Sequence, residues 1–321
     1  MKKTGFILAC LAGLFVFTGC ATQISYNVER PAKLDLRGAD KVAVLPFQTP
    51  AEETTTYFFG LAFSTSKADT PSENVARLLT YKLQTALLDE NYFKVVGSRA
   101  VQTAMENGNP SPCDVYLTGT LSNFKTSIES RIYTDNNGTS YYRYFRKANG
   151  TVSYQVISAD THEVFAIRVS PLSKESYEES KREDLPSAEE LLEDDLDELV
   201  TQIVHELQPY VITKYLTLME DKSKDPEMEK ADKFAKNSSF EEAEKTFLAV
   251  YKSSGSKESG YNAALCQMAQ GKLEDALALM TEVYSIYADK KAYSAIKDIK
   301  TEIAYAENLE EQINARRAKL K

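Results

Sequence analysis

The feature that most constrains the fold is a stretch of alternating residues in the middle of the chain. From Val115 to Val169, hydrophobic and polar side chains alternate with a period near two, which indicates β-strands with one buried face. Turn-forming residues interrupt the stretch at 136–138 (Asn-Asn-Gly), 149–150 (Asn-Gly) and 159–162. The sequence therefore predicts an antiparallel meander with strands over 115–132, 141–146, 152–157 and 164–169.

Helices and short strands flank this meander. The compact apolar runs 41–47 and 93–96 are typical of short buried strands. Helices are predicted from Pro71 and from Pro186-Ser187, because each start is followed by apolar residues at helical spacing. The second of these helices is expected to end near 219. This order of elements predicts an α+β domain over 35–218.

The C-terminal third contains an internal repeat. Phe240-Glu241-Glu242-Ala243 recurs as Leu273-Glu274-Asp275-Ala276, at an offset of 33 residues. A two-helix unit with this period resembles the tetratricopeptide repeat, which implies two helical repeats over 229–288. The alternative is an unrelated pair of helical hairpins. A linker over 219–228 and a charged capping helix over 289–321 complete the predicted organisation.

The first twenty residues have the pattern of an export signal. Lys2 and Lys3 precede the apolar run 5–17, which is shorter than the ~20 residues of a permanent membrane span. The segment ends in Thr18-Gly19-Cys20, which resembles the lipobox of bacterial lipoproteins. This resemblance implies a signal peptide over 1–19, a lipidated Cys20 as the mature N-terminus, and a leader over 20–34. An ordinary secretory signal with an incidental cysteine is the alternative.

The composition disfavours several functional classes. A formal net charge of -9 gives no attraction to nucleic acid, so we expect no nucleic-acid partner. His162 and His205 are the only histidines, and the common catalytic motifs of hydrolases, nucleotide-binding proteins and zinc enzymes are absent from the sequence. We therefore expect no enzyme activity, no metal site and no cofactor. Cys113 and Cys266 are expected to be two buried free thiols, and a single disulfide between them is the alternative.

The α+β region resembles a known family. Its residues 42–47, 93–101, 114–120 and 156–164 are similar to the CsgG-type fold, which includes the lipoproteins CsgG and LpoB and resembles the N-terminal domain of TolB. The resemblance implies a CsgG/LpoB-like sheet-and-helix domain, followed here by the all-α tetratricopeptide-like region. It also implies either regulation of a cell-wall enzyme or assembly into an oligomeric secretion pore.

The predicted hairpin around 136–138 is rich in tyrosine and arginine, a composition typical of protein-binding surfaces. The candidate partner-contact residues are Tyr133, Tyr141, Tyr142, Arg143, Tyr144 and Arg146. The alternative is that these tyrosines only cover the sheet. A membrane-inserted pore strand fits less well, because Arg143 and Arg146 fall on opposite faces of the return strand, so that neither face is free of charge.

These observations predict a lipid-anchored adaptor or scaffold of the cell envelope. It would be anchored in a membrane through Cys20 and would bind envelope proteins of unknown identity. The outer membrane, on the periplasmic or the surface side, is the expected location, and the inner membrane is the alternative. The alternative function is an oligomeric assembly or pore subunit of a CsgG-type secretion system. The oligomeric state is left open by the sequence.

Overall fold

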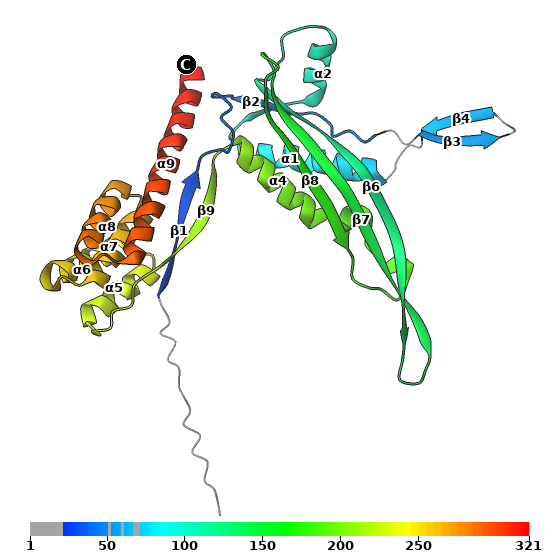
Figure 1. Ribbon diagram of the computed structural model, residues 1–321. Coiled ribbons are helices and arrows are strands. Elements are labelled where there is room, and N and C mark those ends of the chain that lie inside the picture. The colour runs from blue at the N-terminus through cyan, green and yellow to red at the C-terminus, as the bar shows by residue number, and fades with distance from the viewer. Residues whose placement is uncertain (1–21, 51–52, 59–60, 67–70, 321) are drawn as a thin grey trace, which may run out of the picture. The chain divides into compact units, whose positions relative to one another are not determined.

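The computed structural model describes residues 22–50, 53–58, 61–66 and 71–320 (Figure 1). The predicted signal peptide over 1–19 and the predicted anchor Cys20 lie outside the described residues. The chain is a mixture of helices and strands that groups into two compact units. We call them the sheet unit (residues 29–210 and 306–321) and the helical unit (the described part of 1–28 together with 211–305).

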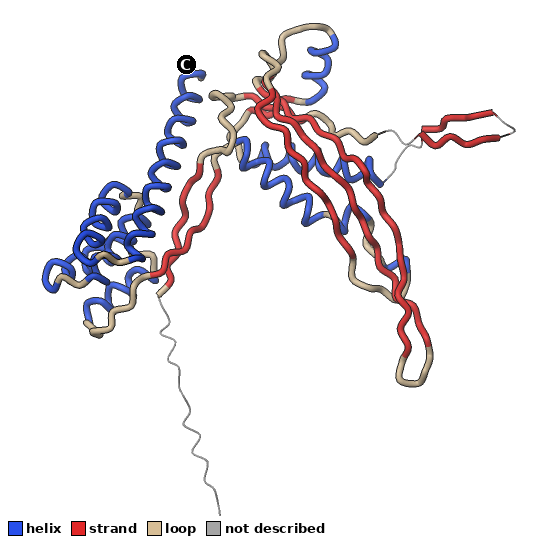
Figure 2. The backbone as a smooth tube through the Cα atoms, in the orientation of Figure 1, coloured by secondary structure: helices blue, strands red, loops and turns tan. Residues whose placement is uncertain are grey.

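A five-stranded mixed sheet forms the centre of the sheet unit (Figure 2). Its strands lie in the order β5-β2-β6-β7-β8, and β2 is parallel to both β5 and β6, whereas β6, β7 and β8 are antiparallel. The bounds are β2 (Lys41–Val44), β5 (Lys94–Val96), β6 (Val115–Thr134), β7 (Ser140–Ser158) and β8 (Val164–Glu175). A separate antiparallel ribbon consists of β3 (Glu53–Phe58) and β4 (Leu61–Ser66).

Helices cover one face of this sheet and form its hydrophobic core (Figure 1). They are α1 (Pro71–Asp89), α3 (Ala188–Leu191) and α4 (Glu193–Leu207). Leu79 and Leu83 on α1 and Ile203 on α4 are fully buried, as their helical spacing predicts, and each contributes roughly 1.5–3 kcal/mol by leaving water. The short helices α2 (Ser98–Glu106) and η1 (Arg182–Asp184) complete the unit. Val101 of α2 packs in a smaller cluster with Ala43, whose side chain points away from the main core.

One predicted reversal is wrong, because β7 continues without a turn through 149–150. Asn149 pairs with both Lys125 and Ser173, so the chain is fully extended there. Gly150 provides space instead of a turn: a Cβ at this position would lie 3.0 Å from the ring of Phe124 and 3.2 Å from Leu121. The reversals at 136–138 and 159–162 are present, and Gly138 has the positive φ of 81° that a tight turn requires.

A strand pair replaces two predicted segments. β1 (Gln23–Arg30) pairs with β9 (Tyr210–Thr217), so most of the predicted leader over 20–34 is a strand, and the predicted long helix ends at Leu207 instead of near 219. Pro209 lacks the backbone N–H that a continuing helix needs, which favours an end at this point. The side chains of β1 alternate between buried and exposed around Ile24 and Tyr26, which is the pattern of a strand with one buried face.

Five helices make up the C-terminal part of the chain: α5 (Pro226–Lys236), α6 (Phe240–Ser254), α7 (Lys257–Ala269), α8 (Leu273–Tyr287) and α9 (Lys290–Lys319). The bounds of α6 recur in α8 at an offset of 33 residues. Ala243 and Ala276 are both fully buried at equivalent positions, and Gly255 and Ala288 both end their helices in a left-handed conformation. The helical unit therefore contains two similar helical hairpins.

The segment after β9 is built into the helical unit instead of serving as a free linker over 219–228. Leu218 and Met219 are buried in the helical core at 1% and 6% exposure. The fully buried side chain of Asn262 accepts a hydrogen bond from the Met219 backbone nitrogen at 2.7 Å and donates one to the Met219 carbonyl oxygen at 2.9 Å. An asparagine amide can satisfy both groups of one extended residue, which explains why this segment is fixed on α7.

The end of α9 differs from the predicted solvated cap over 289–321, since residues from Ala306 belong to the sheet unit. The side-chain amide of Gln312 exchanges two hydrogen bonds with the backbone of Ala32, at 2.9 and 3.0 Å. The guanidinium of Arg316 forms an ion pair with Asp40 at 3.0 Å and lies 3.9 Å from the centre of the Tyr92 ring. These contacts join residues far apart in sequence, and the units consequently depart from the predicted bounds 35–218 and 229–288.

Candidate functional site

The candidate residues of the sequence analysis lie on the outer part of the hairpin formed by β6 and β7. We call residues 125–147 the distal hairpin; it begins after a β-bulge between Ser122 and Lys125 and extends beyond the helices that cover the sheet (Figure 1). A bulge increases the local twist and re-aims the strand that follows it. Most residues of β6 beyond Ile128 are exposed, so this part of the hairpin presents its side chains to solvent.

The strand register divides the candidate residues between two faces. Tyr133 pairs with Tyr141, and Ile132 pairs with Tyr142, so these two pairs lie on opposite faces of the ribbon. The two rings of the first pair stack at a centroid distance of 5.9 Å. The candidates Tyr133, Tyr141 and Arg143 therefore share one face, and Tyr142, Tyr144 and Arg146 share the other.

The face that carries Tyr133 is occupied by charged groups of the sheet unit itself. Arg131 forms ion pairs with Glu175 at 2.7 Å and with Glu178 at 2.5 Å, and it also covers the ring of Phe145 at 4.2 Å. The Tyr133 hydroxyl donates a hydrogen bond to Glu178 at 3.0 Å. The hydrogen bond from Arg131 holds the pKa of Glu178 below its usual value, so the carboxylate stays charged. The charged groups of this face are paired within the sheet unit, while Tyr133 and Tyr141 are 39% and 43% exposed.

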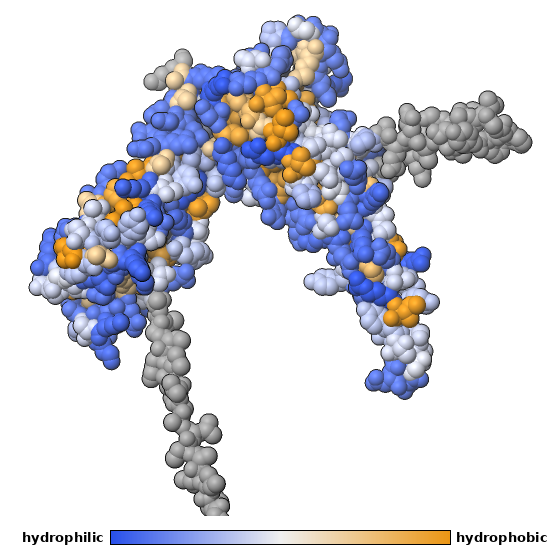
Figure 3. Space-filling model, in the orientation of Figure 1, coloured by the Kyte–Doolittle hydropathy of each residue, from blue (hydrophilic) through white to orange (hydrophobic). Residues whose placement is uncertain are grey.

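The opposite face, which we call the open face, consists of Ile128, Ile132, Tyr142 and Tyr144. Ile132 and Tyr142 are 63% and 54% exposed, and Ile128 is 40% exposed. The rings of Tyr142 and Tyr144 stack at 6.5 Å between centroids. Figure 3 shows apolar side chains interrupting the hydrophilic surface of this hairpin. A row of exposed apolar and aromatic side chains can dock onto another protein with little loss of side-chain entropy.

Arg146 shares this face but has contacts inside the unit. Its Nε donates a hydrogen bond to the carbonyl oxygen of Pro186 at 2.6 Å, and its Nη1 donates one to Thr126 at 3.4 Å. The structure also adds residues that the sequence analysis did not select. Ile128 and Ile132 are among them, and Tyr177, at 92% exposure, follows β8 just before Glu179, which bridges to Tyr144. A lone tyrosine in the charged stretch 170–184 is the signal that marks it.

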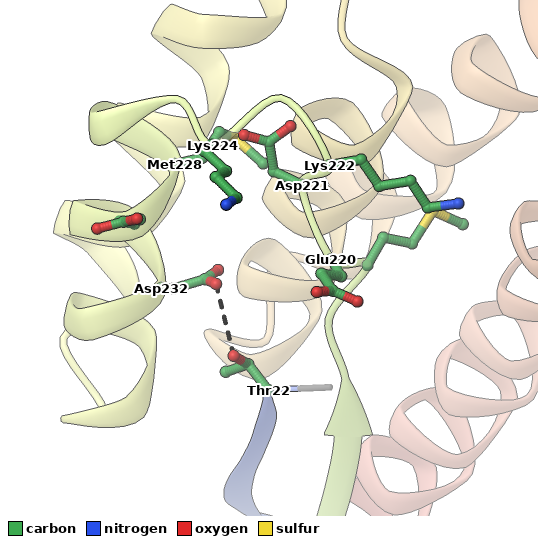
Figure 4. A pocket seen from close by; sticks show the side chains of 9 residues that line it. Thr22, Glu220, Asp221, Lys222, Lys224, Met228 and Asp232 are labelled. Carbon is green, nitrogen blue, oxygen red and sulfur yellow. Dashed lines mark hydrogen bonds between the residues drawn. The ribbon is translucent and has the colours of Figure 1, made fainter. Parts of the chain in front are cut away.

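The helical unit contains a cavity of about 600 Å³ (Figure 4). It is lined by Thr22, the segment 219–222, Lys224 and residues of α5. Asp232 lies on its wall, where one carboxylate oxygen accepts a hydrogen bond from the Thr22 hydroxyl at 3.4 Å. The other oxygen has no hydrogen-bond partner within the described part of the chain. Burial raises the pKa of Asp232, as expected for a carboxylate withdrawn from water without a paired cation.

The charged loop that closes this cavity has a fixed shape. Asp221 accepts hydrogen bonds from the backbone nitrogens of Ser223 at 2.9 Å and Asp225 at 2.7 Å. Lys224 has a left-handed backbone with φ of 60°, an uncommon conformation for a residue with a side chain. Its ammonium group extends into the space in front of Asp232, whereas Lys222 points away from it (Figure 4). The cavity lining therefore combines two lysines, Lys222 and Lys224, with four carboxylates: Glu220, Asp221, Glu229 and Asp232.

The other candidate groups of the sequence analysis lie apart from these sites. His205 stacks on Tyr210 at 3.9 Å, and burial lowers its pKa, while His162 lies in the turn between β7 and β8. Cys113 and Cys266 are buried free thiols. In the residues that the structure describes, no cluster of three or more His, Cys, Asp or Glu side chains is arranged to hold a metal ion. None of the described helices is long and apolar enough to cross a membrane.

Comparison with known proteins gives matches to solved structures only. No family model and no curated protein matches the chain. PelC from Paraburkholderia phytofirmans, solved as a dodecamer, is 15% identical, with 58% of this chain and 98% of that chain covered and a TM-score of 0.29. Lipoprotein GNA1162 from Neisseria meningitidis is 13% identical, with 51% and 98% covered and a TM-score of 0.26. The LpoB C-terminal domain from Salmonella enterica is 12% identical, with 42% and 82% covered and a TM-score of 0.22. With identities and TM-scores this low, the matches determine neither a fold family nor a function.

Proposed function

We propose that this chain is a lipid-anchored adaptor of the bacterial cell envelope whose distal hairpin binds a protein partner. The observation that carries the proposal is the open face, where Ile132 and Tyr142 lie side by side with more than half of each side chain exposed. Docking a partner on this face would remove apolar surface from water, and each Å² buried would stabilise the complex by about 25 cal/mol. The export signal that ends in Cys20 supplies the anchor and the location.

The chemistry of the open face indicates the kind of partner surface. Arg182 lies 5.0 Å from the centre of the Tyr144 ring, and the neighbouring Tyr142 is 54% exposed. A matching surface would have an apolar groove for Ile132 and Tyr142, with carboxylates at its rim facing Arg182. Binding without catalysis is the proposed role.

The proposal includes the finer resemblances of the two units. The parallel β5-β2-β6 arrangement followed by the long antiparallel strands fits a CsgG/LpoB-like domain. The 33-residue offset between α6 and α8 fits tetratricopeptide-like repeats. On this proposal the repeat region is a second protein-binding surface, and the anchor lies in the outer membrane.

Photo-crosslinking in cells tests the binding role of the hairpin. A photoreactive phenylalanine at Tyr142 should give a crosslinked protein band, and Ile132→Asp should abolish that band because it places a charge in the docked surface. Tyr81 on α1 is the matched control, since it is a tyrosine of the same unit with 66% exposure. Equal crosslinking from Tyr81 and Tyr142, or no loss in Ile132→Asp, would contradict the proposal.

Two further measurements test the anchor and the alternative function. Alkyne-palmitate labelling should mark the wild-type chain and not Cys20→Ala. Native mass in detergent separates the two functions, because a monomer supports the adaptor and a closed ring supports an oligomeric assembly or pore subunit.

A further inference from the structure

The cavity beside Thr22 lies next to the predicted lipid anchor in sequence. Thr22 lines the cavity, and it follows Cys20 by two residues. Two residues of chain span at most about 7 Å. A lipid on Cys20 would therefore hold the cavity at the depth of the lipid headgroups. Its volume of about 600 Å³ is that of a small-molecule site.

The carboxylate side of the cavity suits a primary ammonium group. Asp232 offers an oxygen without a hydrogen-bond partner in the described residues, and the Thr22 hydroxyl is adjacent to its second oxygen. A primary ammonium has three N–H donors for such acceptors, whereas a quaternary ammonium has none. Quaternary groups are bound by aromatic rings, and the lining residues of this cavity include no aromatic side chain.

Lys224 is the lysine of the lining that would hold a phosphate, in a cavity that Glu220, Asp221 and Glu229 also line. The ammonium of Lys224 extends into the cavity, and among the described residues it forms no ion pair with a carboxylate. The loop holds this lysine in a left-handed backbone conformation through the hydrogen bonds that Asp221 accepts. Lysine is a common phosphate ligand that acts as a point charge.

We propose that this cavity binds the phosphoethanolamine headgroup of a membrane lipid, with the ammonium at Asp232 and Thr22 and the phosphate at Lys224. The lipid as the source rests on the proposed function, because the anchor at Cys20 brings the cavity to the bilayer. Met219 and Met228 form the apolar part of the lining and face the less polar portion of the lipid.

Carbodiimide coupling tests this proposal directly, because it joins a carboxylate to a primary amine in contact with it. The full chain, reconstituted in vesicles that contain phosphatidylethanolamine, should form a lipid amide at Asp232, detected by mass spectrometry. Vesicles of phosphatidylcholine alone should give none. Lys224→Met should lower the yield at Asp232 about tenfold, the effect of one charge-assisted contact. Lys222→Met is the matched control and should leave the yield unchanged.

The outcomes separate this proposal from the proposed function. Coupling at Asp232 no stronger than at the exposed Glu242 of α6, or an amide between Asp232 and Lys224 themselves, overturns the headgroup site. Absence of the palmitate label from the wild-type chain overturns the anchor at Cys20. Coupling to free O-phosphoethanolamine but not to the lipid overturns the membrane as the source. Palmitate labelling without coupling at Asp232 rejects the cavity and leaves the anchor in place.

Discussion

Replacing Asn262 with alanine should destabilise the helical unit more than any surface change. The substitution removes the two hydrogen bonds of 2.7 and 2.9 Å that hold the backbone of Met219. Both residues are buried, so neither the nitrogen nor the carbonyl oxygen of Met219 gains water in exchange. Each unpaired buried group costs roughly 1–3 kcal/mol, so the free energy of unfolding should fall by about 2–6 kcal/mol.

Urea unfolding of the full chain in a mild detergent measures this change. The chain has no tryptophan, so circular dichroism at 222 nm is the appropriate signal, and it reports chiefly on the helices. The two units need not unfold together, and the transition of the helical unit should move to lower urea. The segment 218–219 should also become accessible to proteases before the helices melt.

Asn314→Ala is the matched control, because it changes an exposed asparagine on a helix and should alter stability by less than about 0.5 kcal/mol. If Asn262→Ala also changes the free energy of unfolding by less than about 0.5 kcal/mol, the backbone of Met219 finds other hydrogen-bond partners. Asn262 would then not be the residue that fixes the segment 218–219 to α7.

Three further predictions concern other buried contacts. Arg316→Ala should lower the thermal unfolding temperature of the sheet unit through loss of its ion pair and its ring contact, while the neighbouring exposed Arg317→Ala should not. Ala276→Leu should overpack the helical unit and cost about 1–3 kcal/mol in calorimetry, whereas Leu at the exposed Ala278 should have little effect. Burial raises the pKa of the Cys266 thiol to about 12, so alkylation at pH 8 should be negligible until urea unfolds the unit; rapid labelling of the native chain would contradict this.

Local patterns predicted the elements whose neighbours are close in sequence. The turn at Gly138, the helix from Pro71 and the 33-residue offset all follow from residues within a few turns or one hairpin of each other. The reversal at Asn149-Gly150 was wrong because that glycine accommodates Phe124, and no local pattern reports such a close approach. Residues 31–209 separate β1 from β9 in the chain, so a single sequence gives their pairing little support.

For the candidate site, too, the sequence predicted local features but not contacts between distant residues. Tyrosine and arginine composition was enough to select the distal hairpin. Its register was needed to show that Tyr133 and Tyr142 lie on opposite faces, and the contact with Pro186 was needed to show that Arg146 serves an internal role. The cavity was missed because the charged residues around Lys224 have the composition of a solvated linker, and only the structure brings Asp232 and Thr22 together.

The contacts at the end of α9 determine when the sheet unit can finish folding. The sheet unit contains both residues 29–210 and residues 306–321, so it acquires its full set of contacts only after residues 306–321 have been synthesised. Until Arg316 has been synthesised, Asp40 has its ion pair with Lys94 but not the one with Arg316, and the ring of Tyr92 lacks its guanidinium contact. Such a dependence on distant residues slows folding. A chain truncated before residue 306 would therefore present an unfinished sheet unit to proteases.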